Sequence, residues 1–330
     1  MMHVAGVTVA RGTKRRHALE LVELADGTRI SLPVLFVNGA VAGPRLYLGA
    51  AIHGDEVNGV AIVARVLAEL DPAALAGSIV AVLVQNPLAF HADHRLALSH
   101  YLKSPLDQAP ADPWTCFPGN PDGSLAEKIA HILFGLIRTC DAAIDCHTPT
   151  RGGRYVPITI LPHPGMGDAS RRAEELAVAF GSGYLVKTDK GMYVRDGILC
   201  VEATRAGVPA FTFEIGEGGR LEPDMVDIGV RCVRNALHHL KMLPGEPQPP
   251  VRTVRIREFV GLRATRGGLL TTEIELGAPV RRGDVLARIR SIYGDDLETV
   301  MSPVDGLYVR STTLSTVAAG ERVATVGVPE

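Results

Sequence analysis

The sequence lacks long hydrophobic segments and any marked excess of charge of one sign. No run approaches the roughly 18 apolar residues that a membrane-spanning helix needs. The N-terminus places a brief apolar stretch ahead of a basic cluster, which reverses the order found in a signal peptide. The formal net charge is only −2 over 330 residues, which gives no reason to expect a nucleic-acid partner. These absences predict a cytoplasmic protein that binds neither membranes nor nucleic acid.

Cysteine is also scarce. The five cysteines are an odd number and include no closely spaced Cys-x-x-Cys pair. The pattern therefore favours neither a disulfide framework nor a cysteine-based zinc site. We expect buried, reduced thiols at Cys116, Cys140, Cys146, Cys200 and Cys232.

The remaining composition is that of an ordinary globular enzyme-sized chain, with 46% hydrophobic and 21% charged residues. Short apolar runs predict buried strands at 45–52, 79–85, 142–146, 156–161 and 208–215. Segments of helical periodicity predict helices over 57–70, 125–138, 170–180 and 225–243. Ser124 and Glu127 form a capping-box pattern ahead of the second helix. The alternation predicts an α/β fold with a mostly parallel or mixed sheet, whose sites form at the carboxyl ends of strands.

A proline-rich linker divides the chain. Four prolines fall within the seven residues 244–250, and they cannot continue the preceding helix. We therefore predict one domain over 1–245 and a smaller one over 251–330. The latter consists of short β-type runs broken by glycine turns and resembles the barrel-sandwich fold of biotinyl and lipoyl carriers. No lysine follows Lys241, so this part cannot carry either modification.

Three residues predict a metal centre. His53 and Glu56 lie between a predicted strand and a predicted helix, with Gly54 allowing the backbone to bend closely. His147 follows another strand and can converge on the same point. Two histidines and one glutamate are a known catalytic zinc set that leaves a position for water. Asp145 shares the strand face of His147 and is a candidate hydrogen-bond acceptor for it.

Glu214 is the one carboxylate within the apolar strand 208–215. Burying a carboxylate is unfavourable unless it is paired or functional. One interpretation is a general base that takes a proton from the attacking water and later delivers it to a leaving amine. The alternative is a structural ion pair with an arginine.

These motifs, taken in order along the chain, resemble the succinylglutamate desuccinylase and aspartoacylase family, which is related to the zinc carboxypeptidases. The resemblance covers about residues 40–240. Its other motifs are Asn86–Phe90, Arg95, Phe117–Gly119 and Gly207–Ala210. It implies a zinc carboxypeptidase-like mixed sheet flanked by helices, followed by a C-terminal all-β barrel-sandwich domain.

The resemblance also implies roles for individual residues. His53, Glu56 and His147 match the ligands of one zinc ion per chain, and Glu214 matches the catalytic carboxylate. Arg95 matches an arginine that polarises the scissile carbonyl and stabilises the oxyanion. The implied activity is zinc-dependent deacylation of a small N-acyl amino acid. The sequence leaves open whether the protein forms a homo-oligomer.

One motif departs from the family pattern. Where the family reads Asp-Leu-Asn-Arg, whose last two residues help to hold a substrate carboxylate, this chain reads Asp112-Pro113-Trp114-Thr115. Trp114 either packs against substrate or merely fills a loop. Arg151 and Arg154, in the loop after His147, are candidates to replace the lost arginine.

Three alternatives remain at this stage. His91, His94 and His100 suggest a second metal site, although loop histidines are common. A carboxypeptidase acting on peptides would use the same zinc centre. A metal-binding or sensing protein that has lost catalysis would keep the scaffold, but it would have little use for Glu214.

Overall fold

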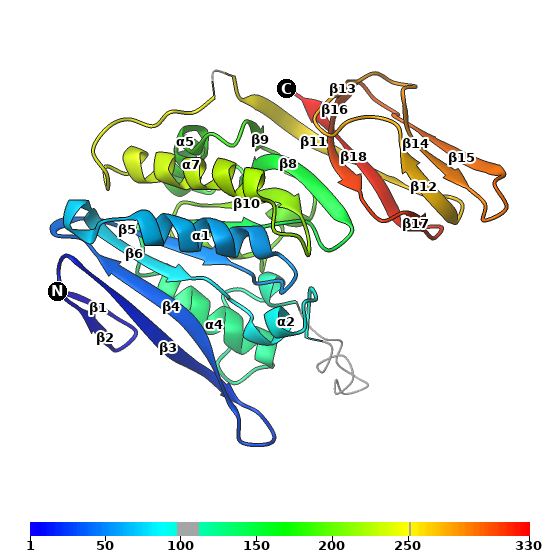
Figure 1. Ribbon diagram of the computed structural model, residues 1–330. Helices are drawn as coiled ribbons and strands as arrows, with labels where there is room; N and C mark the ends of the chain where they lie inside the picture. Colours follow the sequence, from blue (N-terminus) through cyan, green and yellow to red (C-terminus); the bar gives the residue numbers. More distant parts are fainter. Residues whose placement is uncertain (98–111, 251) are drawn as a thin grey trace.

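The computed structural model describes residues 1–97, 112–250 and 252–330. Its framework is a 12-stranded mixed sheet (Figure 1), whose central strands β6, β5, β7 and β10 are parallel. This confirms the mixed α/β fold. In spatial order the strands are β13 (Pro279–Val280), β16 (Gly306–Thr312), β18 (Arg322–Pro329), β11 (Val254–Arg263), β9 (Tyr184–Val186), β8 (Gly153–Ile160), β10 (Ala210–Glu217), β7 (Ala142–His147), β5 (Val41–Ala50), β6 (Ala76–Val82), β4 (Arg29–Asn38) and β3 (Thr13–Glu23).

Two smaller sheets and a set of helices complete the described structure. The sheets are β1 (Met2–Val4) with β2 (Val7–Val9), and β15 (Asp296–Met301), β14 (Val285–Arg290), β12 (Gly268–Thr272) and β17 (Thr316–Val317). The α-helices are α1 (Val57–Glu69), α2 (Pro87–His91), α4 (Leu125–Ile137), α5 (Gly167–Phe180), α6 (Leu199–Arg205) and α7 (Pro223–His239). None of these helices combines the length and apolar character needed to cross a bilayer.

The central sheet is buried on both faces because its side chains alternate between two hydrophobic clusters. Leu46 and Leu48 of β5 join a cluster with α1, α5 and α7, whereas Tyr47 joins a second cluster with α4 and α6. Successive residues of a strand point to opposite faces, so one apolar strand supplies both clusters. This explains why β5 and β6 have near-continuous apolar sequences.

The elements predicted from periodicity are present. β5, β6, β7, β8 and β10 correspond to the five predicted strands, and α1, α4, α5 and α7 to the four predicted helices. At the start of α4, the Ser124 backbone N–H donates to Glu127 Oε2 at 2.8 Å, and the Glu127 N–H donates to Ser124 Oγ at 3.4 Å, which confirms the capping box. The five cysteines are free thiols, although Cys116 is only half-buried.

Four of the described strands after the linker, β11, β13, β16 and β18, continue the main sheet. β11 pairs in parallel with β9, and β16 pairs antiparallel with β8. Ile256 and Val309 share a hydrophobic cluster with Tyr155 and Ile158 of β8. In Figure 1 these strands, coloured yellow to red, lie at one end of the molecule. The described residues after the linker contain strands and turns but no helix, and some of them share backbone hydrogen bonds and a hydrophobic cluster with the preceding part of the chain.

This shared core generates a prediction about stability. Ile256 is fully buried in the shared cluster, whereas Ile292 is 76% exposed. Ile256→Ala is expected to lower the free energy of unfolding by about 2–5 kcal/mol, because it removes buried methyl groups and leaves a cavity. The matched Ile292→Ala is expected to change it by less than about 0.5 kcal/mol. Chemical denaturation measures both, and equal effects would contradict the shared core.

Candidate active site

The predicted site residues converge at the carboxyl ends of the parallel strands. His53 and Glu56 lie in the connection between β5 and α1, and His147 is the last residue of β7. Glu214 of β10 lies directly opposite His147 in the parallel pairing of their strands. This is the edge where open α/β sheets form their sites.

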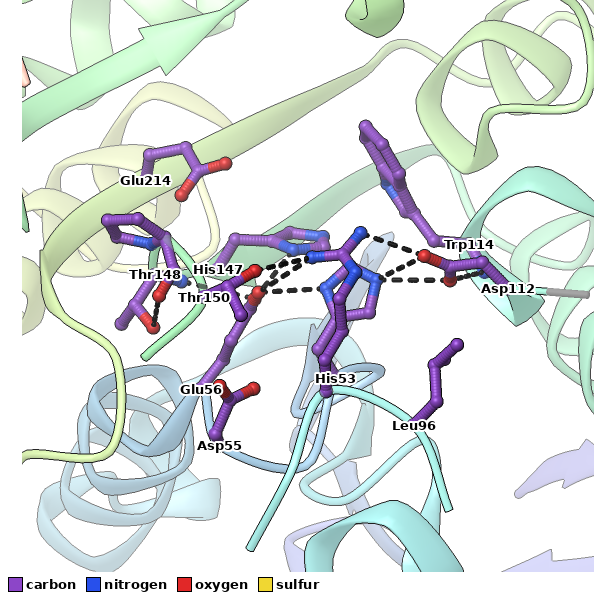
Figure 2. A network of polar contacts seen from close by, with 12 residues as sticks. His53, Asp55, Glu56, Leu96, Asp112, Trp114, His147, Thr148, Thr150 and Glu214 are labelled. Atoms are coloured by element: carbon purple, nitrogen blue, oxygen red, sulfur yellow. Dashed lines mark hydrogen bonds and ion pairs between the residues drawn. The ribbon is translucent and has the colours of Figure 1, made fainter. Parts of the chain in front are cut away.

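His53, Glu56 and His147 form a compact, buried triad. The two carboxylate oxygens of Glu56 are shared between the histidines: Oε1 lies 2.8 Å from His53 Nδ1, and Oε2 lies 2.8 Å from His147 Nδ1. Figure 2 shows Glu56 between the two imidazoles. One ligand atom from each residue lies within 4.8 Å of the other two. The structure thus brings together the three predicted metal ligands.

The outer nitrogen of each imidazole is held by a second carboxylate. His147 Nε2 lies 2.7 Å from Asp145 Oδ2, the acceptor predicted from the strand face. His53 Nε2 lies 3.1 Å from both oxygens of Asp112 (Figure 2). Burial lowers the pKa of both imidazoles, but the neighbouring carboxylates outweigh burial and raise that pKa. A bound cation would replace the proton on each Nδ1, while each Nε2 would keep its proton and its carboxylate partner. The role of Asp112 was missed, although its position at the head of the family motif was a usable signal.

The ionised state of Glu56 suits the binding of a cation by the triad. Burial raises the pKa of Glu56, but the imidazoles of His53 and His147 outweigh burial and lower that pKa to about 2. Glu56 therefore stays ionised at neutral pH, as a carboxylate ligand must. Two imidazole nitrogens and one carboxylate form a donor set typical of catalytic zinc sites. The residues present fit a single divalent cation, with Nδ1 as the donor of each histidine.

Gly54 permits the close turn between two of the ligands. A Cβ at this position would collide with the backbone carbonyl of Ala89 in α2. The Gly54 N–H also donates to the carbonyl of His94 at 3.1 Å. Only a residue without a side chain fits here, which explains its place between the two ligands.

Glu214 lines the pocket next to the triad and has a tyrosine as its partner. The Tyr193 hydroxyl donates to Glu214 Oε1 at 2.7 Å. The other oxygen, Oε2, is buried and has no hydrogen-bond partner among the described residues. Burial and the nearby Glu56 raise the pKa of Glu214. A carboxyl group with a raised pKa and a free oxygen suits proton transfer near neutral pH.

Arg95 and Trp114 line the same pocket, whose empty volume, together with space open to solvent, is about 460 Å³. Arg95 Nη2 lies 2.8 Å from Asp112 Oδ2, and Nη1 lies 3.7 Å from Glu56 Oε1. The Trp114 ring packs edge-on against His53 and His147, with centroid distances of 5.9 and 5.6 Å. Trp114 thus both fills the loop and forms a wall of the pocket.

Other predicted residues lie elsewhere. The Arg151 guanidinium pairs with Asp93, and Arg154 Nη2 lies 2.8 Å from Glu222 Oε1. Neither arginine is among the residues lining the pocket. The arginines that do line it, besides Arg95, are Arg310 and Arg322 from the strands after the linker.

Sequence reasoning missed Arg310 and Arg322, as it missed Tyr155 and Tyr193 in the same wall. No motif surrounds these residues, so the sequence offered no signal for them. For the suggested second metal site, His91 is exposed and His94 Nδ1 lies 3.2 Å from the Leu96 carbonyl. His100 lies outside the described residues, and within them the only candidate metal cluster is the triad.

The catalytic-domain model of the succinylglutamate desuccinylase/aspartoacylase family matches residues 42–240. This stretch is more than half of the chain and contains the triad, Arg95 and Glu214. The chain belongs to this family. This membership confirms the family resemblance drawn from the ordered motifs.

Relatives of this desuccinylase/aspartoacylase family protein match it along nearly its whole length. N-alpha-acetyl-L-2,4-diaminobutyric acid deacetylase of Halomonas elongata is 27% identical over 306 residues, which cover 90% of this chain and 85% of the relative. The product-bound structure of the ectoine utilization protein EutE (DoeB) from Ruegeria pomeroyi matches with a TM-score of 0.83 and 26% identity, covering 98% of this chain and 97% of the other. A succinylglutamate desuccinylase from Silicibacter sp. TM1040 shares the fold, with a TM-score of 0.85, 24% identity and 98% coverage of both chains.

The triad predicts the metal content of the purified protein. His147→Ala removes one of three donors and is expected to abolish most of the bound divalent metal, which should be about one equivalent per chain in the unaltered protein. His91→Ala removes an exposed histidine of α2 and is expected to leave metal content unchanged. Elemental analysis after gel filtration measures both. A His147→Ala protein with a full equivalent of metal would refute the ligand assignment.

Proposed function

We propose that this protein is a zinc-dependent deacylase that hydrolyses the amide bond of a small N-acyl amino acid. The observation that carries the proposal is the juxtaposition of Glu214, with its unpartnered carboxylate oxygen, and the His53–Glu56–His147 triad in one pocket. The names of the matched family and of the Halomonas elongata relative both refer to deacylation. They support an amide hydrolase over a metal sensor without activity.

In the proposed mechanism Glu214 moves the proton. Zinc, when bound by the triad, supplies Lewis acidity toward the amide carbonyl and the attacking water. Glu214 takes a proton from that water through Oε2, while the Tyr193 hydroxyl holds Oε1 and fixes the carboxyl plane. The same group then delivers the proton to the leaving amine nitrogen, so that a carboxylic acid and an amine are released.

Arg95 supplies fixed positive charge beside the reaction. Its guanidinium is anchored by Asp112, and its Nη1 also lies 3.1 Å from Thr150 Oγ1. A held guanidinium can donate hydrogen bonds to an oxyanion as negative charge develops on the former carbonyl oxygen. Asp112 thereby serves two groups, because it also orients His53.

We propose an N-acetylated diamino acid as the substrate class. The support is the similarity to N-alpha-acetyl-L-2,4-diaminobutyric acid deacetylase of Halomonas elongata, together with the likeness to an ectoine utilization protein. We also propose that residues 251–330 act as a module that shapes the pocket, with catalysis in residues 1–245.

Glu214→Gln tests the catalytic step. The change keeps the size of the side chain but removes its basic oxygen, so kcat is expected to fall about 10²- to 10⁴-fold. Metal content and thermal stability should remain close to those of the unaltered protein. Glu217→Gln, at the end of the same strand and outside the pocket lining, is the matched control and should keep full activity. A fully active Glu214→Gln protein would refute the assigned role.

Substrate comparison separates a deacylase from a peptidase. The zinc-loaded protein is expected to hydrolyse N-acetyl-2,4-diaminobutyrate with a kcat/KM at least about tenfold above that for N-blocked dipeptides, since an N-acetylated diamino acid is the proposed substrate class. Amine release measured at matched concentrations gives the ratio. Preferential hydrolysis of the dipeptides would instead favour the carboxypeptidase alternative.

A further inference from the structure

The strands after the linker contribute an arginine to the pocket that holds the triad. Arg310 of β16 lies opposite Tyr155 of β8 in the antiparallel pairing of these strands, and it lines the pocket. The pairing of β16 with β18 is irregular between Tyr308 and Arg310. Such irregularities re-aim side chains and often occur beside functional sites.

The guanidinium of Arg310 has one nitrogen donor that is not hydrogen-bonded to any described residue. Its Nη1 is buried and has no hydrogen-bond partner among the described residues. Arg95, in contrast, is already engaged by Asp112 and Glu56. Burial lowers the pKa of Arg310, because desolvation disfavours the charged form. A buried cation with a free donor is costly, and an anionic ligand in the pocket would offset that cost.

Gly153 makes room for this side chain. A Cβ at Gly153 would lie 2.5 Å from Arg310 Nη2 and 3.1 Å from its Cζ. The guanidinium therefore packs directly on the backbone at the start of β8, just after the loop that follows His147. The start of β8 thus leaves space for the side chain of Arg310, a residue that follows the linker.

The other candidates for holding a substrate carboxylate are less suitable than Arg310. In the motif to which the family resemblance assigns this role, the chain has Trp114 and Thr115, and Thr115 is exposed. Arg151 and Arg154 lie outside the pocket lining. Of the arginines that line it, Arg95 is engaged by carboxylates and Arg322 is exposed. Arg310 is the remaining lining arginine of the described residues, with a buried free donor.

We propose that Arg310 binds the free carboxylate of the N-acyl amino acid, an inference that rests on the proposed deacylase function. A guanidinium offers paired N–H donors that match the two oxygens of a carboxylate. With the carboxylate at β16, the scissile amide lies toward the triad and Glu214. The strands after the linker therefore select the substrate, and the central sheet carries out the reaction.

The test compares an N-acetyl amino acid with its carboxamide, which keeps the scissile amide but lacks the negative charge. Arg310→Ala is expected to raise the KM for the acid by about 10- to 100-fold and the KM for the carboxamide by less than about twofold, as expected for loss of hydrogen bonds to a charged group. The kcat for both should change little. Arg310→Lys, which keeps the charge, should recover part of the loss. Arg288→Ala, an arginine of β14 paired with Glu273, is the matched control.

Binding without turnover separates this proposal from the proposed function. Calorimetric titration of N-acetyl-2,4-diaminobutyrate into metal-loaded Glu214→Gln protein, with and without Arg310→Ala, should show binding weakened by the second change. If the unaltered protein hydrolyses no N-acyl amino acid but this difference persists, the deacylase function fails and the carboxylate site stands. Equal effects on acid and carboxamide, or none on either, would overturn the site. If Arg310→Ala does not fold, Arg310→Gln keeps most of the packing volume and gives the same comparison.

Discussion

The Glu56 carboxylate is shared by the Nδ1 atoms of two histidines, and the site is built around this arrangement. For both imidazoles to reach one carboxylate, β5 and β7 must be neighbours that end at the same edge of the sheet, which their parallel pairing provides. The connection after β5 must also turn tightly, which explains the glycine at position 54. The hydrophobic clusters on the two faces of the sheet hold these strands rigidly, so the triad is preorganised by the core.

Negative charge accumulates around this triad. Glu56, Asp112 and Asp145 all contact its imidazoles, and Glu214 lies close enough to Glu56 for its pKa to be raised. Arg95 offsets part of this charge through Asp112 and Glu56. A divalent cation between the three donors would offset more and would let both imidazoles be neutral. The donor geometry and the charge balance therefore support the same proposed cofactor by independent arguments.

The sequence predicted those features that depend on local pattern. The strands and helices of the central sheet follow from apolar periodicity, and the triad follows from residues placed at strand ends. Features that depend on long-range pairing were not predicted. Asp112 meets His53 across 59 positions, and Arg310 reaches the pocket only because β16 pairs with β8. The N-terminal strands were also missed, since β3 mixes charged and apolar residues on a largely exposed strand.

The pairing of β16 with β8 brings a strand from after the linker to the pocket that Trp114 lines. Trp114 packs against both histidines and Tyr193, so it forms an apolar wall of the pocket. The cation proposed to bind the substrate carboxylate, Arg310, comes from β16. β16 pairs with β8, and Gly153 leaves space for the Arg310 guanidinium where these two strands meet. In the proposed arrangement, changes on β16 would alter carboxylate binding without disturbing the triad, because His53, Glu56 and His147 all precede the linker.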